Sequence, residues 1–142
     1  MNCISLLKDQ HRAIEGLFAS LHDARDAKAR ERALDALAAE LLDHLGAEER
    51  VLYAAMEDLD AAAVEAGLRE HEAIRRQLAD LARVRPTTAA FTAGVDALAA
   101  RFHRHAKDED ERLFVSSRRC LGIEMLEDLA LDLSESLPAH PG

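Results

Sequence analysis

The two halves of the chain carry the same polar residues in the same order, and this repetition restricts what the chain can fold into. Each half contains a lone histidine followed by a His-x-x-x-Glu pair. The repeated residues are His11, His44 and Glu48 in the first half, and His71, His105 and Glu109 in the second. Four imidazoles and two carboxylates at matched positions form a ligand set suited to a pair of metal ions.

Apolar residues recur at steps of three and four along four stretches of the sequence, beginning with Ile4, Leu7 and Ile14. This period keeps them on one face of a helix. The six repeated polar residues occupy positions in the same apolar faces, which predicts that they point inward. We expect helices over residues 2–23, 28–57, 60–84 and 88–117.

The interruptions between these stretches are short. Asp60, and either Thr87 or Thr88, are suitable N-caps for the third and fourth helices, and Pro86 disfavours helix in the residue before it. Short connections place long neighbouring helices antiparallel. The sequence therefore predicts an all-α fold, namely an up-down-up-down antiparallel four-helix bundle.

A fifth apolar stripe follows the bundle. Its residues, at helical spacing, are Ile123, Leu126, Leu129, Leu133 and Leu137. They predict a short C-terminal helix over about 123–136 that closes one edge or end of the bundle, and residues 138–142 are expected to fray. We find no linker, and we expect residues 1–142 to form a single domain with the bundle over about 2–117.

Composition excludes several classes of function. A net charge of −9 over 142 residues argues against a nucleic-acid partner or an anionic membrane surface. The sequence has no apolar run of membrane-spanning length and no secretory signal, and Cys3 and Cys120 do not form a CxxC unit. We expect a cytoplasmic protein, either a monomer or a small homo-oligomer.

The positions of Glu48 and Glu109 carry the argument for a metal site. An unpaired charge buried in a protein interior costs several kcal/mol. Cations at the same depth in the bundle as the two carboxylates would offset this cost. Residues four apart on a helix lie about 40° apart around the axis and about 6 Å along it. Each His-x-x-x-Glu pair can therefore converge on the bundle axis, at a depth that the lone histidines share.

The mixture of donors indicates which metal is bound. Imidazole with carboxylate suits iron, and zinc or manganese less well. Six donors exceed the four that a structural zinc takes, whereas two ions about 3.5–4 Å apart can share bridging carboxylates. Ferritin-like bundles use Glu-x-x-His pairs, and this chain has none.

The order His, His-x-x-x-Glu, His, His-x-x-x-Glu, with Glu48-Glu49-x-x-Leu52-Tyr53 and Glu70-His71, resembles the hemerythrin-like (HHE cation-binding) family over roughly residues 5–117. The resemblance implies a four-helix bundle with a non-haem di-iron centre, two iron ions with an oxo or hydroxo bridge, that meets O₂, NO or peroxide. It also implies terminal histidine ligands and bridging glutamates. The metal ligands on this pattern are His11, His44, Glu48, His71, His105 and Glu109.

The chain departs from the oxygen-carrier members of this family. They have a second histidine where this chain has Arg75, and their last carboxylate would correspond to Asp110 rather than Glu109. A regular helix turns Asp110 about 100° away from Glu109, so we prefer Glu109. The chain resembles the four-histidine members more closely, which argues against simple reversible O₂ transport. Glu15 or water remains open as a further donor.

Two other residues receive an interpretation from the sequence. Tyr53 matches Phe114 in the repeat and is interpreted as a packing residue rather than a redox residue. Arg75 is interpreted as an ion-pair partner of Glu15 or Glu72.

Three functions stay open. The first is a non-haem di-iron protein that binds O₂, NO or peroxide for sensing, storage or scavenging. The second is a di-iron enzyme in peroxide or NO detoxification or in iron–sulfur repair. The third is a metal-free structural bundle. We favour a binding protein over an enzyme, because nothing in the sequence identifies a cysteine donor or a partner surface for the enzymatic reactions.

Overall fold

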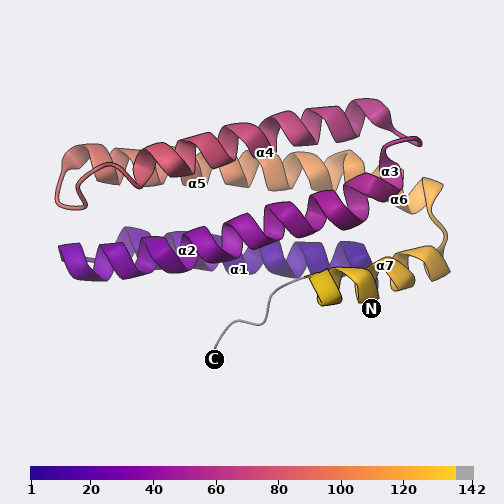
Figure 1. The fold of residues 1–142 in the computed structure, drawn as a ribbon, viewed down its shortest axis with the longest axis horizontal. Coiled ribbons are helices and arrows are strands. Elements are labelled where there is room, and N and C mark those ends of the chain that lie inside the picture. Colours follow the sequence, from indigo (N-terminus) through magenta and orange to yellow (C-terminus); the bar gives the residue numbers. More distant parts are fainter. Residues whose placement is uncertain (137–142) are drawn as a thin grey trace.

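The computed structural model describes residues 1–136, and every regular element in that range is a helix (Figure 1). The elements are α1 (Cys3–Asp23), α2 (Ala27–Glu48), η1 (Glu49–Tyr53), α3 (Ala54–Met56), α4 (Ala61–Leu81), α5 (Ala89–Glu111), α6 (Leu113–Cys120) and α7 (Ile123–Ser136). The backbone stays helical from α2 through the π-helical η1 into α3. The all-α four-helix bundle with a short C-terminal helix is thereby confirmed.

The long helices pack as two antiparallel pairs, α1 against α2 and α4 against α5 (Figure 1). Further contacts between α1 and α5 join the pairs into one bundle. Helix α7 folds back against α1, near the N-terminus of the chain (Figure 1). Among the described residues, no helix has the length and apolar character needed to cross a membrane.

Side-chain caps begin each long helix. Asn2, Asp26, Asp60 and Thr88 each accept a hydrogen bond from a backbone N–H in the first turn. Such caps satisfy donors that have no partner within the helix. Asp60 and Thr88 therefore have the role that the sequence predicts for them.

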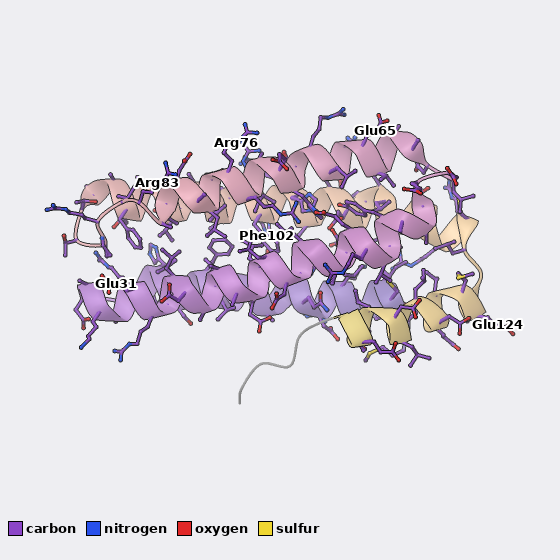
Figure 2. The ribbon with its side chains drawn as sticks, viewed as in Figure 1. Glu31, Glu65, Arg76, Arg83, Phe102 and Glu124 are labelled. Atoms are coloured by element: carbon purple, nitrogen blue, oxygen red, sulfur yellow. The ribbon has the colours of Figure 1, made fainter. Side chains whose placement is uncertain are left out.

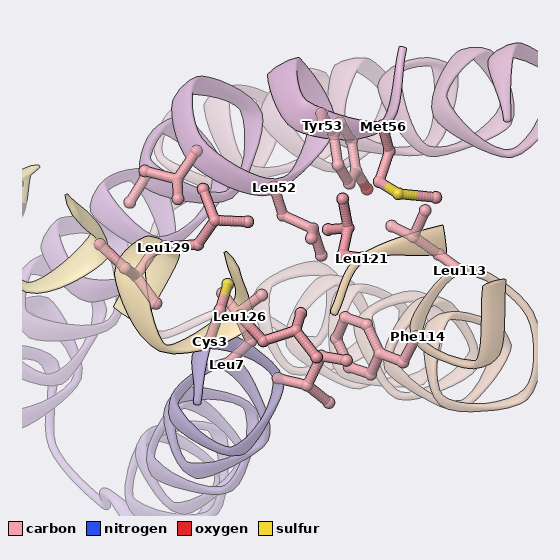
Figure 3. Packing of buried hydrophobic residues seen from close by; sticks show 14 of the residues in the cluster. Cys3, Leu7, Leu52, Tyr53, Met56, Leu113, Phe114, Leu121, Leu126 and Leu129 are labelled. Atoms are coloured by element: carbon pink, nitrogen blue, oxygen red, sulfur yellow. The ribbon is translucent and has the colours of Figure 1, made fainter. Parts of the chain in front are cut away.

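The buried apolar residues form two clusters, and the repeated histidines and glutamates fall between them. On α1, for example, Leu7 belongs to one cluster and Ile14 to the other, with His11 between them. Figure 3 shows one cluster, in which α7 contributes Leu126 and Leu129. Phe102 belongs to the other cluster and lies in the bundle interior (Figure 2). The polar layer is thus enclosed by apolar packing along the bundle axis.

The helices differ from the sequence predictions at four places, and one of these is the end of the last bundle helix, since α6 continues to Cys120 rather than ending at residue 117. Helix α4 ends at Leu81 rather than residue 84, in a turn that leads to Pro86. The fourth predicted helix is broken at Arg112, whose φ of −121° and ψ of −73° separate α5 from α6. The second predicted helix, over residues 28–57, contains the π-helical turn η1. Leu137 and the predicted tail over 138–142 lie outside the described residues.

Candidate metal centre

Four helices bring the six repeated residues to one level of the bundle. They are His11 on α1, His44 and Glu48 on α2, His71 on α4, and His105 and Glu109 on α5. None of the six is more than 5% exposed. Antiparallel packing produces this common level because the lone histidines and the His-x-x-x-Glu pairs lie at matching depths along their helices.

Glu48 lies between two pairs of imidazoles. Its Oε2 is 3.8 Å from Nε2 of His11 and 3.6 Å from Nε2 of His44. Its Oε1 is 2.9 Å from Nε2 of His71 and 3.8 Å from Nε2 of His105. One carboxylate oxygen therefore faces each pair, which is the arrangement that a bridging carboxylate requires.

Glu109 also lies between the two pairs, but with a single oxygen. Its Oε1 is 3.2 Å from Nε2 of His11 and 3.3 Å from Nε2 of His105. Its Oε2 accepts a hydrogen bond of 2.7 Å from the hydroxyl of Tyr53. That hydroxyl also lies 3.1 Å from Nε2 of His71.

The six residues form two overlapping groups of four, each able to offer four ligand atoms within 4.8 Å of one another. One group is His11, His44, Glu48 and Glu109, and the other is Glu48, His71, His105 and Glu109. Imidazole nitrogens and carboxylate oxygens are suitable donors for a divalent transition metal. Two groups that share both carboxylates match a dinuclear arrangement.

Buried atoms without hydrogen-bond partners support this fit. They are Nε2 of His11 and His44, Oε2 of Glu48 and Oε1 of Glu109. A buried polar atom without a partner costs about 1–3 kcal/mol, and more when the group is charged. All four atoms point into the ligand cluster, where a cation would contact them. The residues present therefore fit a metal centre.

The charges of this cluster depend strongly on one another. Burial alone would raise the pKa of Glu48, but the charge of His44 and then the contacts with the other imidazoles lower it well below its usual range. Burial alone would lower the pKa of His11 and His105, but their contacts with Glu109 and Glu48 raise the pKa values to about 9 and about 10. Burial dominates at His44 and lowers its pKa to about 3. The two carboxylates therefore favour the protonated form of the His11 and His105 imidazoles.

Two of the imidazoles have a side-chain partner on the nitrogen that faces away from the cluster. Nδ1 of His44 lies 2.6 Å from Oε1 of Gln10, and Nδ1 of His71 lies 2.6 Å from Oε2 of Glu49. Both oxygens accept, so Nδ1 carries the proton and Nε2 is left to bind a metal. Arg75 fixes Glu49 through an ion pair of 2.7 Å.

Aromatic rings cover two of the imidazoles. Tyr53 stacks on His71 with centroids 5.0 Å apart, and Phe114 stacks on His11 at 5.8 Å. The Tyr53 ring lies against the backbone of Gly67, where a Cβ would come within 2.6 Å of Cζ. The absence of a side chain at Gly67 thus makes the space that the ring occupies.

The remaining sequence candidates lie outside the cluster. Glu15 pairs with His103 at 2.8 Å, and Asp110 lies 4.0 Å from Lys8. Together with His11, these four residues line part of a surface cavity of about 330 Å³ between α1 and α5. This cavity reaches the edge of the ligand set at His11.

Three contacts of the site differ from the sequence interpretation or escaped it. Arg75 pairs with Glu49 instead of with Glu15 or Glu72. Tyr53 packs as expected, but its hydroxyl also binds Glu109 within the ligand set. The contact of Gln10 with His44 was not predicted, because nothing in the sequence distinguishes Gln10 except that it precedes His11.

The fold and the buried His/Glu layer define the class, a helical-bundle protein with an interior cluster of histidines and glutamates that could hold a metal ion. The sequence matches the profile of the hemerythrin HHE cation-binding domain over residues 2–115, so the chain belongs to that family.

A crystal structure of a hemerythrin HHE cation-binding domain-containing protein from Mycobacterium kansasii has the same fold, with a TM-score of 0.85. The match covers 95% of this chain and 84% of that one, at 22% sequence identity. No curated protein matches the sequence significantly.

Proposed function

We propose that this chain is a non-haem di-iron protein that binds O₂, NO or peroxide, for sensing, storage or scavenging. The observation that carries the proposal is the pair of overlapping four-residue ligand groups that share Glu48 and Glu109. Membership of the HHE cation-binding family supports a metal at this site. Iron is favoured over zinc or manganese because the two groups offer mixed imidazole and carboxylate donors at adjacent positions.

The six residues would have two kinds of role toward the iron ions. His11, His44, His71 and His105 would be terminal ligands, and Glu48 and Glu109 would bridge. Bound iron would supply one-electron chemistry and an exchangeable coordination position. The two apolar clusters restrict water, and the Tyr53 hydroxyl keeps its proton, because burial and then the charges of Glu48 and Glu109 raise its pKa far above its usual value.

Metal analysis with absorption spectroscopy tests this proposal. The purified chain is loaded anaerobically with Fe²⁺, oxidised in air and then mixed with azide. We expect two irons per chain and ligand-to-metal absorption that azide changes. A Glu48→Gln variant should lose both ions, whereas His22→Ala, a change at an exposed histidine, should keep them. One zinc per chain without colour would contradict the proposal.

A second candidate is an enzyme that decomposes peroxide or reduces NO. The buried Tyr53 hydroxyl favours it, because it places a hydrogen-bond donor within the ligand set, 2.7 Å from Oε2 of Glu109. Repeated turnover of peroxide or NO by the iron-loaded chain would support the enzyme. Binding without turnover would support the first function.

A further inference from the structure

The two cation positions have matching ligands but different surroundings. We name them the His11–His44 position and the His71–His105 position, and both share Glu48 and Glu109. By residue type each position contains two imidazoles and the same two carboxylates. Residue type therefore does not distinguish the two positions, whereas the residues around the ligands do.

The first difference is the charge behind one imidazole of each position. His44 is backed by the neutral amide of Gln10, whereas His71 is backed by the carboxylate of Glu49. Oε2 of Glu49 lies 2.6 Å from Nδ1 of His71 and 2.7 Å from the guanidinium of Arg75. A carboxylate on the outer nitrogen makes an imidazole a stronger metal ligand than an amide does.

The internal repeat does not supply an equivalent carboxylate for the other position. Asp110 follows Glu109 as Glu49 follows Glu48, but it lies near Lys8 at the surface cavity. Glu70 precedes His71 as Gln10 precedes His11, but it pairs with Arg101 at 3.0 Å.

The second difference is the aromatic residue over the imidazole. Tyr53 covers His71, and its hydroxyl reaches both that ring and Glu109. Phe114, the matching residue of the repeat, covers His11 with an apolar ring. The His71–His105 position therefore has the more polar surroundings on two independent counts.

We propose that the two positions bind a divalent cation with unequal affinity, and that Glu49, held by Arg75, makes the His71–His105 position the tighter one. The inference rests on the proposed metal-binding function. Glu49 acts as a positioning residue, because its contact is with His71 rather than with the ion. Arg75 contributes by holding the carboxylate in place through the ion pair of 2.7 Å.

Single-position variants test the proposal with Co²⁺ as the probe. His44→Ala leaves the His71–His105 position, and His71→Ala leaves the His11–His44 position. We expect the His44→Ala chain to bind one Co²⁺ about tenfold to a hundredfold more tightly than the His71→Ala chain does. This is the usual effect on metal affinity of a residue that hydrogen-bonds to a metal ligand. Adding Glu49→Gln should remove this advantage in the His44→Ala chain and change nothing in the His71→Ala chain.

Two further variants sharpen the test. Glu72→Gln, an exposed change on the same helix as His71, should leave both affinities unchanged. Gln10→Glu in the otherwise intact chain should raise the affinity of the weaker Co²⁺-binding step, so that the two dissociation constants become more alike. Equal affinities in the two single-position variants, or an equal loss on adding Glu49→Gln, would overturn the inference.

The intact chain provides a measurement that does not depend on the folding of the alanine variants. With one equivalent of Co²⁺, the paramagnetically shifted imidazole N–H signals should come from His71 and not from His44. Shifted signals from His44 alone, or from both in equal amounts, would overturn the inference. Failure of the wild-type chain to bind any Co²⁺ would instead contradict the proposed function.

Discussion

The hydroxyl of Tyr53 donates a hydrogen bond of 2.7 Å to Oε2 of Glu109, a residue on a different helix of the bundle. The contact depends on η1, which follows Glu48 directly. In a regular α-helix a residue five positions after Glu48 would point about 140° away. The wider π-helical turn reduces that angle, so Glu48 and Tyr53 both face the cluster.

Tyr53→Phe is expected to destabilise the metal-free protein by about 1–3 kcal/mol, because a buried carboxylate oxygen loses its donor. Urea denaturation of the metal-free chain measures the effect. The iron-loaded variant should still contain two ions, since Tyr53 is not among the proposed ligands. Unchanged stability of the metal-free variant would show that the hydrogen bond is of no consequence.

Gly67→Ala is expected to destabilise the protein by about 1–3 kcal/mol, the usual cost of overpacking. The new methyl group would overlap the ring of Tyr53, which stacks on His71 one turn further along α4. Gly16→Ala is the matched control, since no atom lies within 4 Å of its Cβ and alanine favours helix by about 0.5–1 kcal/mol. The midpoint temperature of thermal unfolding should fall for Gly67→Ala and rise for Gly16→Ala.

The two cysteines are expected to react at very different rates. Burial, and then the charge of Glu48, raises the pKa of Cys3 to about 12, whereas Cys120 is exposed. A thiol reagent at pH 8 should modify one thiol quickly and the second only after unfolding. Cys120→Ser should abolish the fast phase. A second fast thiol in the folded protein would contradict this prediction.

The stability of the metal-free protein is expected to fall as the pH rises from 7 to 10. Folding raises the pKa of His11 to about 9 and of His105 to about 10, so the folded state holds more protons than the unfolded state over this range. Stability from such groups is complete below the unfolded value of about 6.5 and is lost as pH passes the folded values.

Urea midpoints between pH 7 and pH 10 measure this dependence. Metal displaces the same protons, so the loaded protein should show little change over that range. A metal-free protein whose midpoint is constant or increases with pH would show that these imidazoles are not protonated in the cluster.

Much of the fold follows from periodicity. Steps of three and four residues predicted the long helices, and Asp60 and Thr88 marked two of their starts. The break at Arg112 and the π-helical turn η1 were not predicted. Each changes locally which face of the helix the next residues occupy, while the apolar pattern on either side continues. Such shifts depend on packing between helices rather than on the propensity of the residues involved.

The sequence by itself determined that four histidines and two glutamates would lie on the inner faces of an antiparallel bundle, because helical spacing dictates which residues share a face. The tertiary structure alone decided how the two halves differ. Glu49 reaches His71, Tyr53 reaches Glu109, and Gln10 reaches His44, each across a helix boundary. Spacing within one helix contains no information about which residue of a neighbouring helix a side chain meets, so the repeated pattern could not predict these contacts.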